Sequence, residues 1–281
     1  MAIKTTLLLS LFFRLTSSER GDISVTLVIA HRGLSQQCPE NTMPAFMAAL
    51  DLGADGLETD VQETADHQLV LCHDDRVERT TNGTGKISQL TLAQIQQLDA
   101  GCQFYGHSTT VKMPTLNLLL RQLRRRRFSG ILNIELKAQS RDHQHVVVAL
   151  VHQLLLFPDL ASKVVVSSFS VALLSAFRSE ISQRDAPAIK TALLIRWRVH
   201  RAQQLLGQRK ITGVHPKWWL LFLHYHWLIN HCSQLRFWTV NRLPLIKWCF
   251  EHDVAAIITD EVELALLFQK MQQQKQRNFM A

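Results

Sequence analysis

The sequence is poor in the residues and patterns that mark disulfide scaffolds, membrane spans and nucleotide-binding loops. Its five cysteines are an odd number, are widely spaced and form no C-x-x-C pair, which predicts reduced thiols and no structural zinc site. No stretch reaches the ~18 consecutive apolar residues that a membrane-spanning helix needs. A Gly-rich phosphate loop or Walker pattern is also missing, so nucleotide-dependent phosphoryl transfer is not expected.

Acidic residues are scarcer than basic ones, with 23 Asp and Glu against 31 Lys and Arg, and the formal net charge is +8. Such an excess favours an anionic partner. The densest basic run is RQLRRRRF at 121–128, which fits either a nucleic-acid or anionic-lipid contact or a solvated helix face. No aromatics alternate with these arginines and no nucleic-acid-binding motif accompanies them. We therefore favour the helix face and expect no nucleic-acid partner.

The two ends of the chain are expected to lie outside the folded unit, which we place at residues 23–268. Residues 1–22 begin with MAIKTTLLLSLFFRLTSS, a weak match to a signal peptide that Arg14 interrupts and that no small-x-small site follows. A frayed extension or a short membrane-touching helix explains this segment equally well. We expect a cytoplasmic protein, with export or membrane association through residues 1–18 as the alternative. Residues 269–281 are predicted to be a frayed helical tail.

Short β-branched runs alternate with stretches of helical spacing through most of the chain. Between most of the runs lie a dozen or more residues of helical periodicity, as at 42–53 and at 170–181, where Ser170 is the expected N-cap. This alternation predicts a parallel sheet, and about eight such units predict a closed (β/α)8 TIM barrel. The predicted strands are 25–30, 56–61, 69–73, 131–136, 163–168, 191–195, 211–215, 235–240 and 255–260.

Nine strands are one too many for such a barrel, and the sequence explains the excess locally. Residues 56–73 read as strand, polar turn and strand, with no room for a crossover helix, so we expect a hairpin-like excursion there. The Gly/Thr-rich stretch 75–115 is then a small insertion over one end of the barrel.

Polar side chains recur at the carboxyl ends of the predicted strands, where barrel enzymes keep their active sites. His31 and Arg32 end the first strand, and His73 ends the third. Two further strands place polar residues at alternate positions and therefore on one face. These pairs are Glu58 with Asp60 and Glu135 with Lys137; Ser168, His215, Trp238, Asn241 and Asp260 follow on later strands.

Three of these residues are carboxylates in otherwise apolar strands, and buried carboxylates need a compensating charge. A hard divalent cation bound by Glu58, Asp60 and Glu135 would supply it, and all-oxygen ligands favour Mg²⁺ or Ca²⁺ over zinc. Lys137 and Arg32 would then neutralise an anion brought to the metal.

The two histidines complete a set of groups that suits phosphodiester cleavage. A lone His31 would more often be a structural histidine. Beside a metal, however, His31 and His73 fit a general acid and a general base, because the unperturbed pKa of histidine lies near neutral pH. A cation, a guanidinium and two imidazoles together predict a phosphodiesterase.

Eight short motifs resemble, in order and in spacing, those of the glycerophosphodiester phosphodiesterase family, most closely its cytosolic bacterial members. The similarity runs from about residue 27 to residue 265. It implies a (β/α)8 barrel and metal-dependent hydrolysis of small-molecule glycerophosphodiesters such as glycerophosphocholine and glycerophosphoethanolamine. The products would be sn-glycerol 3-phosphate and an alcohol. The motifs are AHRG, PENT, LETDVQ, LCHDDRVERTTNGTG, NIELK, VVSSF, WTVN and IITD.

The resemblance also implies roles for individual residues. The family's acid/base pair falls on His31 and His73. Its metal-binding carboxylates fall on Glu58, Asp60 and Glu135, with Mg²⁺ or Ca²⁺ as the cofactor.

Five further positions match residues that contact substrate or support the site in the family. Arg32 and Lys137 match phosphate or substrate contacts. Glu40 and Asn41 match a motif that supports the metal and the histidines. Trp238 matches a pocket aromatic that could stack on the glycerol or the alcohol.

Some features depart from the family pattern. Leu34 stands where a second glycine is common, and HDVAAIITD replaces the usual Gly-Val-Asp-Gly before the last strand. The segment HPKWWLLFLHYHWLINH at 215–231 is unusually rich in aromatics and histidine; a helix packed on the barrel is the favoured interpretation, and a lipid-contacting patch the other. Two alternative functions remain: a phospholipase acting on intact or lyso lipids, and a catalytically silent barrel used as a binding module.

Overall fold

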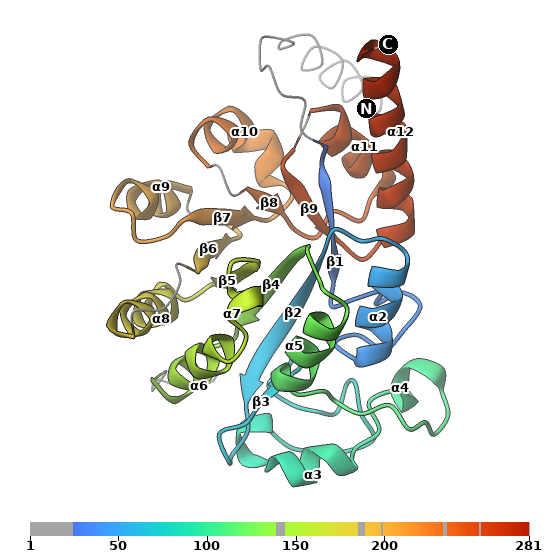
Figure 1. Cartoon of the computed structure of the whole chain (residues 1–281), viewed down its shortest axis with the longest axis vertical. Coiled ribbons are helices and arrows are strands. Elements are labelled where there is room, and N and C mark those ends of the chain that lie inside the picture. Colours follow the sequence, from blue (N-terminus) through green and yellow to red (C-terminus); the bar gives the residue numbers. More distant parts are fainter. Residues whose placement is uncertain are drawn as a thin grey trace, which may run out of the picture.

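A computed structural model describes residues 25–138, 144–184, 189–197, 199–232, 235–252 and 254–280, so the predicted extension 1–22 lies outside the described part. Parallel strands form the centre in the order β7-β6-β5-β4-β2-β1-β9-β8. Bridges from Val214 to Leu235 and from Lys217 to Trp238 join β7 to β8, so the sheet closes on itself (Figure 1). The predicted (β/α)8 barrel is confirmed. Its strands are β1 Leu27–His31, β2 Gly56–Glu63, β4 Ile131–Leu136, β5 Val164–Ser168, β6 Lys190–Ile195, β7 Gly213–Pro216, β8 Arg236–Phe237 and β9 Ala256–Thr259.

The ninth strand is the predicted hairpin partner. β3, Leu69–Leu71, runs antiparallel to β2, with Val61 opposite Leu71. The last strand of the sheet order is shorter than the sequence pattern predicts. β8 ends at Phe237, but the next residue, Trp238, still bridges to Lys217 and donates its indole N–H to the carbonyl oxygen of His215 at 2.6 Å.

Helices cover the outside of the barrel (Figure 1). Ser170 caps α8 as predicted, since its side chain accepts a hydrogen bond from the backbone N–H of Leu173. Gly53, just after α2, adopts a left-handed φ of 94° and ends that helix where the sequence indicates. The helices are α2 Met43–Asp51, α5 Leu116–Arg125, α6 Gln144–Leu155, α7 Pro158–Ala161, α8 Val171–Gln183, α9 Val199–Gly207, α10 Leu220–His231, α11 Leu243–Glu251 and α12 Val262–Met280.

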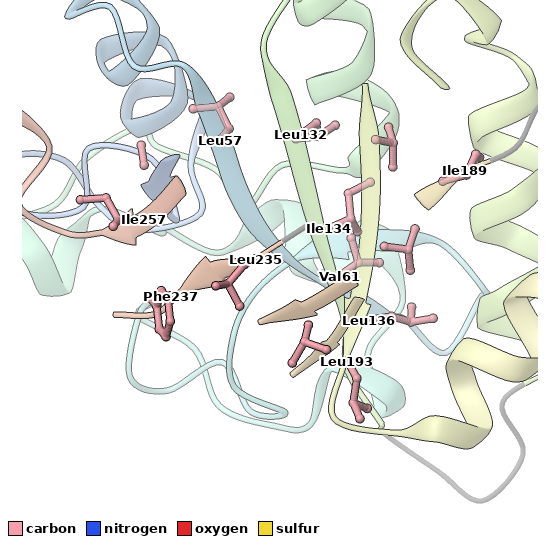
Figure 2. Close-up of a cluster of buried hydrophobic side chains, with 14 of the residues drawn as sticks. Leu57, Val61, Leu132, Ile134, Leu136, Ile189, Leu193, Leu235, Phe237 and Ile257 are labelled. Carbon is pink, nitrogen blue, oxygen red and sulfur yellow. The ribbon is translucent and has the colours of Figure 1, made fainter. Parts of the chain in front are cut away.

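The main core lies between the strands and this helical layer. Figure 2 shows Leu57 and Val61 of β2 beside Leu132, Ile134 and Leu136 of β4, all buried in one cluster. Each such side chain contributes about 1.5–3 kcal/mol of burial free energy. Because side chains alternate along a strand, the intervening positions of β2 and β4 point to the barrel interior. These are the positions that carry the carboxylates.

The insertion between β3 and α5 has a small core of its own, built from Val70, Val77, Ile87, Ile95 and Met113 among others. It contains η1 Ile87–Gln89, α3 Leu92–Gln97 and α4 Cys102–Tyr105. Because Val70 belongs to β3, this core is anchored to the hairpin, and the insertion holds the segment that follows the hairpin in place.

α12 continues through Met280, beyond residue 268 where the sequence places the end of the barrel unit. Gln272 in this helix donates to the carbonyl oxygen of Phe250, and Gln269 donates to that of Thr26. The helix therefore ties the end of the described chain to the start of β1. In the part of the chain that the structure describes, no helix combines the length and the apolar character needed to cross a bilayer.

Candidate active site

The chain turns sharply where β1 ends, and this turn presents the first two site residues. Arg32 and Gly33 adopt left-handed φ angles of 58° and 82°. A Cβ on Gly33 would lie 2.6 Å from the carbonyl carbon of Ala45, so only glycine fits where the turn passes α2. His31 and Arg32 are thereby held at the carboxyl end of the barrel.

Strand register brings the three predicted metal ligands together. Asp60 of β2 lies directly opposite Glu135 of β4, and Glu58 lies opposite His31 of β1. Glu58, Asp60 and Glu135 each offer an oxygen within 4.8 Å of the others. Glu58 and Asp60 are only 3% and 1% exposed. Their closeness follows from the register of adjacent parallel strands.

The carboxylates of the cluster disfavour one another's charged forms. Burial and the neighbouring Asp60 carboxylate raise the pKa of Glu58 and of Glu135 above the usual range for glutamate. Burial would also raise the pKa of Asp60, but Lys137 and Arg32 hold it below its usual range. A set of three oxygen-donating carboxylates in this state fits a hard divalent cation.

Two basic side chains border the cluster. Lys137 Nζ lies 2.8 Å from Asp60 Oδ1 and 2.6 Å from Glu135 Oε1. Arg32 Nε lies 3.3 Å from Asp60 Oδ2, while its Nη1 donates to Glu40 Oε1 at 2.9 Å. Both cations are mostly buried, and both lie where they can contact an anion bound at the carboxylates.

Asn41 supports the cluster from the loop that follows β1. Its amide Nδ2 donates to Asp60 Oδ2 at 2.9 Å, and its Oδ1 accepts from Thr59 Oγ1 at 2.8 Å. The residue is 2% exposed and has a left-handed φ of 56°, which asparagine tolerates better than most residues. These bonds fix the orientation of the Asp60 carboxylate.

Each histidine is held by an aspartate through the same ring nitrogen. His31 Nδ1 lies 2.6 Å from Asp260 Oδ1, and His73 Nδ1 lies 2.6 Å from Asp74 Oδ1. Such a contact makes Nδ1 the protonated nitrogen and leaves Nε2 as the second titrating position. His31 Nε2 lies 3.9 Å from Glu58 Oε2, which directs that nitrogen toward the carboxylates.

The surroundings shift the two histidines in opposite directions. Burial alone would lower the pKa of His31, but Glu58 and the hydrogen bond to Asp260 raise it above its usual value. Burial lowers the pKa of His73, although Asp60 opposes the change.

An arginine that the sequence analysis did not single out links the two halves of the site. Arg79, in the insertion, donates from Nε to Asp74 Oδ2 at 2.5 Å. Its two terminal nitrogens donate to Glu40 at 2.8 and 2.7 Å, and Glu40 also accepts from Arg32. The motif HDDRVER was visible in the sequence, but the pairing of its last arginine with Glu40 depends on how the insertion packs.

Asp260 was noted in the sequence only as a strand end. Besides holding His31, its carboxylate accepts from Asn241 Nδ2 and, at 3.2 Å, from Ser35 Oγ. Trp238 lies on a neighbouring wall, against Phe169 with ring centroids 5.4 Å apart. Hydrogen bonds and ion pairs thus join nine of the ten predicted site residues into one network, and Trp238 borders it from the side of β7 and β8.

Comparison with known families agrees with this geometry. The model of the glycerophosphoryl diester phosphodiesterase family matches residues 31–264. This range contains every residue described above in the site.

Individual relatives are similar over most of the chain. A glycerophosphodiester phosphodiesterase of Caldanaerobacter subterraneus subsp. tengcongensis is 33% identical over 246 residues, covering 85% of this chain and 95% of that protein. One from Bacillus altitudinis is 35% identical over 192 residues, covering 68% and 76%. The solved structure of an Oleispira antarctica phosphodiesterase in complex with the product sn-glycerol-3-phosphate superposes with a TM-score of 0.75, at 24% identity, covering 87% of this chain and 96% of that one. At that identity the superposition supports the fold. By its family match and these relatives, the chain is an enzyme that belongs to the glycerophosphoryl diester phosphodiesterase family.

Proposed function

We propose that the protein hydrolyses small glycerophosphodiesters, such as glycerophosphocholine, to sn-glycerol 3-phosphate and an alcohol, in a reaction that depends on Mg²⁺ or Ca²⁺. One observation carries this proposal. Two histidines, each anchored through Nδ1 by an aspartate, adjoin a buried cluster of three carboxylates. The product named in the Oleispira antarctica structure supports the same substrate class.

Glu58, Asp60 and Glu135 would bind the cation. When bound, it would supply Lewis-acid polarisation of a phosphoryl oxygen. The chain's own contribution is to fix these carboxylates, through strand register and through the hydrogen bond from Asn41 to Asp60. The donor set, all oxygen, is the support for Mg²⁺ or Ca²⁺ as the metal.

His31 and His73 would transfer the protons. With Nδ1 of each ring bonded to an aspartate, Nε2 is the nitrogen that can accept a proton from the nucleophile or donate one to the leaving alcohol. General acid or base catalysis of this kind contributes about 10²–10⁴-fold each. The nucleophile is either water or the neighbouring glycerol hydroxyl, and the second route would release a cyclic phosphate before glycerol 3-phosphate.

Arg32 and Lys137 would bind the non-bridging phosphate oxygens and stabilise the charge of the transition state. Glu40 holds Arg32 in position for this role. Trp238 would pack on the glycerol or alcohol part of the substrate. We assign the activity to residues 23–268, within which the family match 31–264 lies.

The direct test is the release of glycerol 3-phosphate from glycerophosphocholine, measured with Mg²⁺, with Ca²⁺ and with EDTA. Metal-dependent release is the expected result. A folded protein that binds the cation yet releases no glycerol 3-phosphate from any glycerophosphodiester would overturn the proposal, and would leave a silent barrel or a lipid substrate.

A further inference from the structure

The charge and the tryptophans of this chain are concentrated in one segment. Residues 186–250 contain ten Lys and Arg and no Asp or Glu. The net charge of this segment is therefore larger than the +8 of the whole chain. All six tryptophans also lie in this segment. The catalytic chemistry proposed above uses only Trp238 among them.

The fold brings part of this segment to the carboxyl ends of the strands. Trp197 follows β6, Trp219 follows β7, and Arg242 follows β8. In a barrel these loops surround the same opening as the residues after β1 and β2. We call the resulting surface the aromatic-basic rim, and define it as Trp197, Lys217, Trp218, Trp219, Phe222 and Arg242.

The rim is continuous. The rings of Trp197 and Trp219 are 5.1 Å apart between centroids, those of Trp218 and Trp219 5.7 Å, and those of Trp218 and Phe222 6.3 Å. Two cations lie over these rings: Lys217 Nζ is 5.7 Å from the centroid of Trp219, and Arg242 is 5.8 Å from that of Trp218. Aromatic faces and positive charge are therefore interleaved at one place.

The apolar part of the rim is open to solvent. Trp197 is 63% exposed and Phe222 is 49% exposed. Leu223, which follows Phe222 in the chain, is 65% exposed, and Leu243, which follows Arg242, is 52% exposed. If α10 only packed on the barrel, its large apolar side chains Phe222 and Leu223 would face the barrel rather than solvent. A contiguous exposed apolar patch instead marks a contact site.

The rim adjoins the catalytic groups. Lys217 Nζ lies 4.4 Å from the centroid of the Trp238 ring, on the wall of the site. Burial and Arg196 lower the pKa of Lys217, while Asp260, the partner of His31, opposes that shift. A partner bound at the rim would thus lie beside the opening of the active site.

We propose that the aromatic-basic rim docks on an anionic phospholipid bilayer and holds the active-site opening at the membrane surface. Interleaved indole rings and Lys or Arg side chains match the interfacial layer of a bilayer, where amphipathic rings and long cationic side chains settle. The absence of Asp and Glu from residues 186–250 provides the charge complementarity to anionic headgroups. Docking would give the enzyme direct access to phosphodiesters formed when phospholipids lose their acyl chains.

The test is co-sedimentation of the full chain with sucrose-loaded vesicles of phosphatidylcholine with 30% phosphatidylglycerol, compared with pure phosphatidylcholine. The rim variant combines Phe222→Ser with Arg242→Glu. Its matched control combines Leu156→Ser, on a residue 51% exposed at the end of α6, with Arg125→Glu in α5. Both variants reverse the charge of one arginine and remove one apolar side chain that is about half exposed, so a difference between them reports position.

We expect the unaltered chain and the control to bind anionic vesicles and the rim variant to lose binding by about tenfold or more, since charge near an anionic surface contributes strongly to partition. Tryptophan emission should shift to the blue on binding. Turnover of soluble glycerophosphocholine should be retained by both variants, which also shows that they fold. Equal loss in both variants, binding to neutral vesicles alone, no vesicle binding, or a rim-dependent dimer without vesicle binding would each overturn the proposal.

Discussion

His31 and Asp260 are bonded at 2.6 Å although 229 residues separate them in the chain. β1 and β9 are neighbours in the barrel, and the ladder from Leu27 opposite Ala256 to Ala30 opposite Thr259 carries the two residues to the same level. The contact is therefore a product of barrel closure. His73 and Asp74 make the equivalent contact between adjacent residues.

The Asp260 contact predicts a positioning role. Asp260→Asn should leave the fold intact but lower kcat on the order of 10²-fold, within the usual contribution of one acid/base group, because the wrong nitrogen of His31 becomes protonated. KM should change much less than kcat. Steady-state kinetics on glycerophosphocholine, with circular dichroism for folding, measure both. An unchanged kcat with a raised KM would contradict the role.

Removing either imidazole should abolish catalysis without removing the metal. We expect His31→Ala and His73→Ala to lower kcat about 10²–10⁴-fold. Neither residue belongs to the carboxylate cluster, so Mg²⁺ or Ca²⁺ should still raise the thermal midpoint of each variant. Near-normal turnover in either variant would sink the assignment of that histidine.

Loss of a carboxylate should affect metal binding and activity together. At a free cation concentration of about 100 Kd, binding adds about 2.7 kcal/mol to the free energy of unfolding. Glu135→Gln should reduce this gain and the activity in parallel, as EDTA does for the unaltered chain. Calorimetric titration of the cation into both proteins checks the point; Asp159→Asn, at an exposed position of α7, serves as the control. Full activity of the Glu135 variant in EDTA would exclude the metal role.

The insertion should lose stability at low pH through Asp99. This side chain is 5% exposed and accepts hydrogen bonds from Thr109 and from the backbone N–H groups of Gly101 and Cys102. The hydrogen bonds from Thr109, followed by those from the backbone, lower the pKa of Asp99 from 3.8 to about 2.

A carboxyl whose folded pKa is depressed stabilises the fold above its unfolded pKa, and the gain disappears as pH falls toward the folded value. The free energy of unfolding of the Asp99→Asn variant should therefore be lower than that of the unaltered chain, by the same amount at pH 7 and at pH 5. The difference should shrink between about pH 4 and pH 2. Urea titrations across that range measure it, and a difference that does not depend on pH would rule out this cause.

Two glycines with positive φ make a matched pair for testing the turn after β1. Gly33→Ala combines left-handed backbone strain with a clash against Ala45 and should lower the free energy of unfolding by about 3 kcal/mol or more. Gly53→Ala has a φ of 94° but no atom within 4 Å of the added Cβ, and should cost only about 1 kcal/mol. Equal losses in chemical denaturation would show that the close approach to α2 has no effect.

Periodicity in the sequence was sufficient to predict the barrel and the β2–β3 hairpin, because alternation and spacing are local signals. The positions of the candidate site residues also follow from the sequence, since strand ends converge in a parallel barrel. Their roles in catalysis stay predictions, as do the boundaries at residues 23 and 268. The partners of those residues could not be predicted in the same way. Arg79 reaches Glu40 only because the insertion folds back over the turn after β1, and no local pattern encodes that approach.

The insertion's separate core has a consequence for how the two histidines are held. His31 ends a strand of the barrel, whereas His73 follows β3, in which Leu69 and Leu71 pack in the main core and Val70 packs in the small core of the insertion. The two histidines are therefore held differently: Asp260 of the barrel holds His31, while Asp74, itself bonded to Arg79 of the insertion, holds His73. A sub-global opening of the insertion would release Arg79 from Asp74 while leaving the carboxylate cluster intact. The insertion thus acts on His73 through Arg79 and Asp74, whereas the carboxylates depend on the strands of the barrel alone.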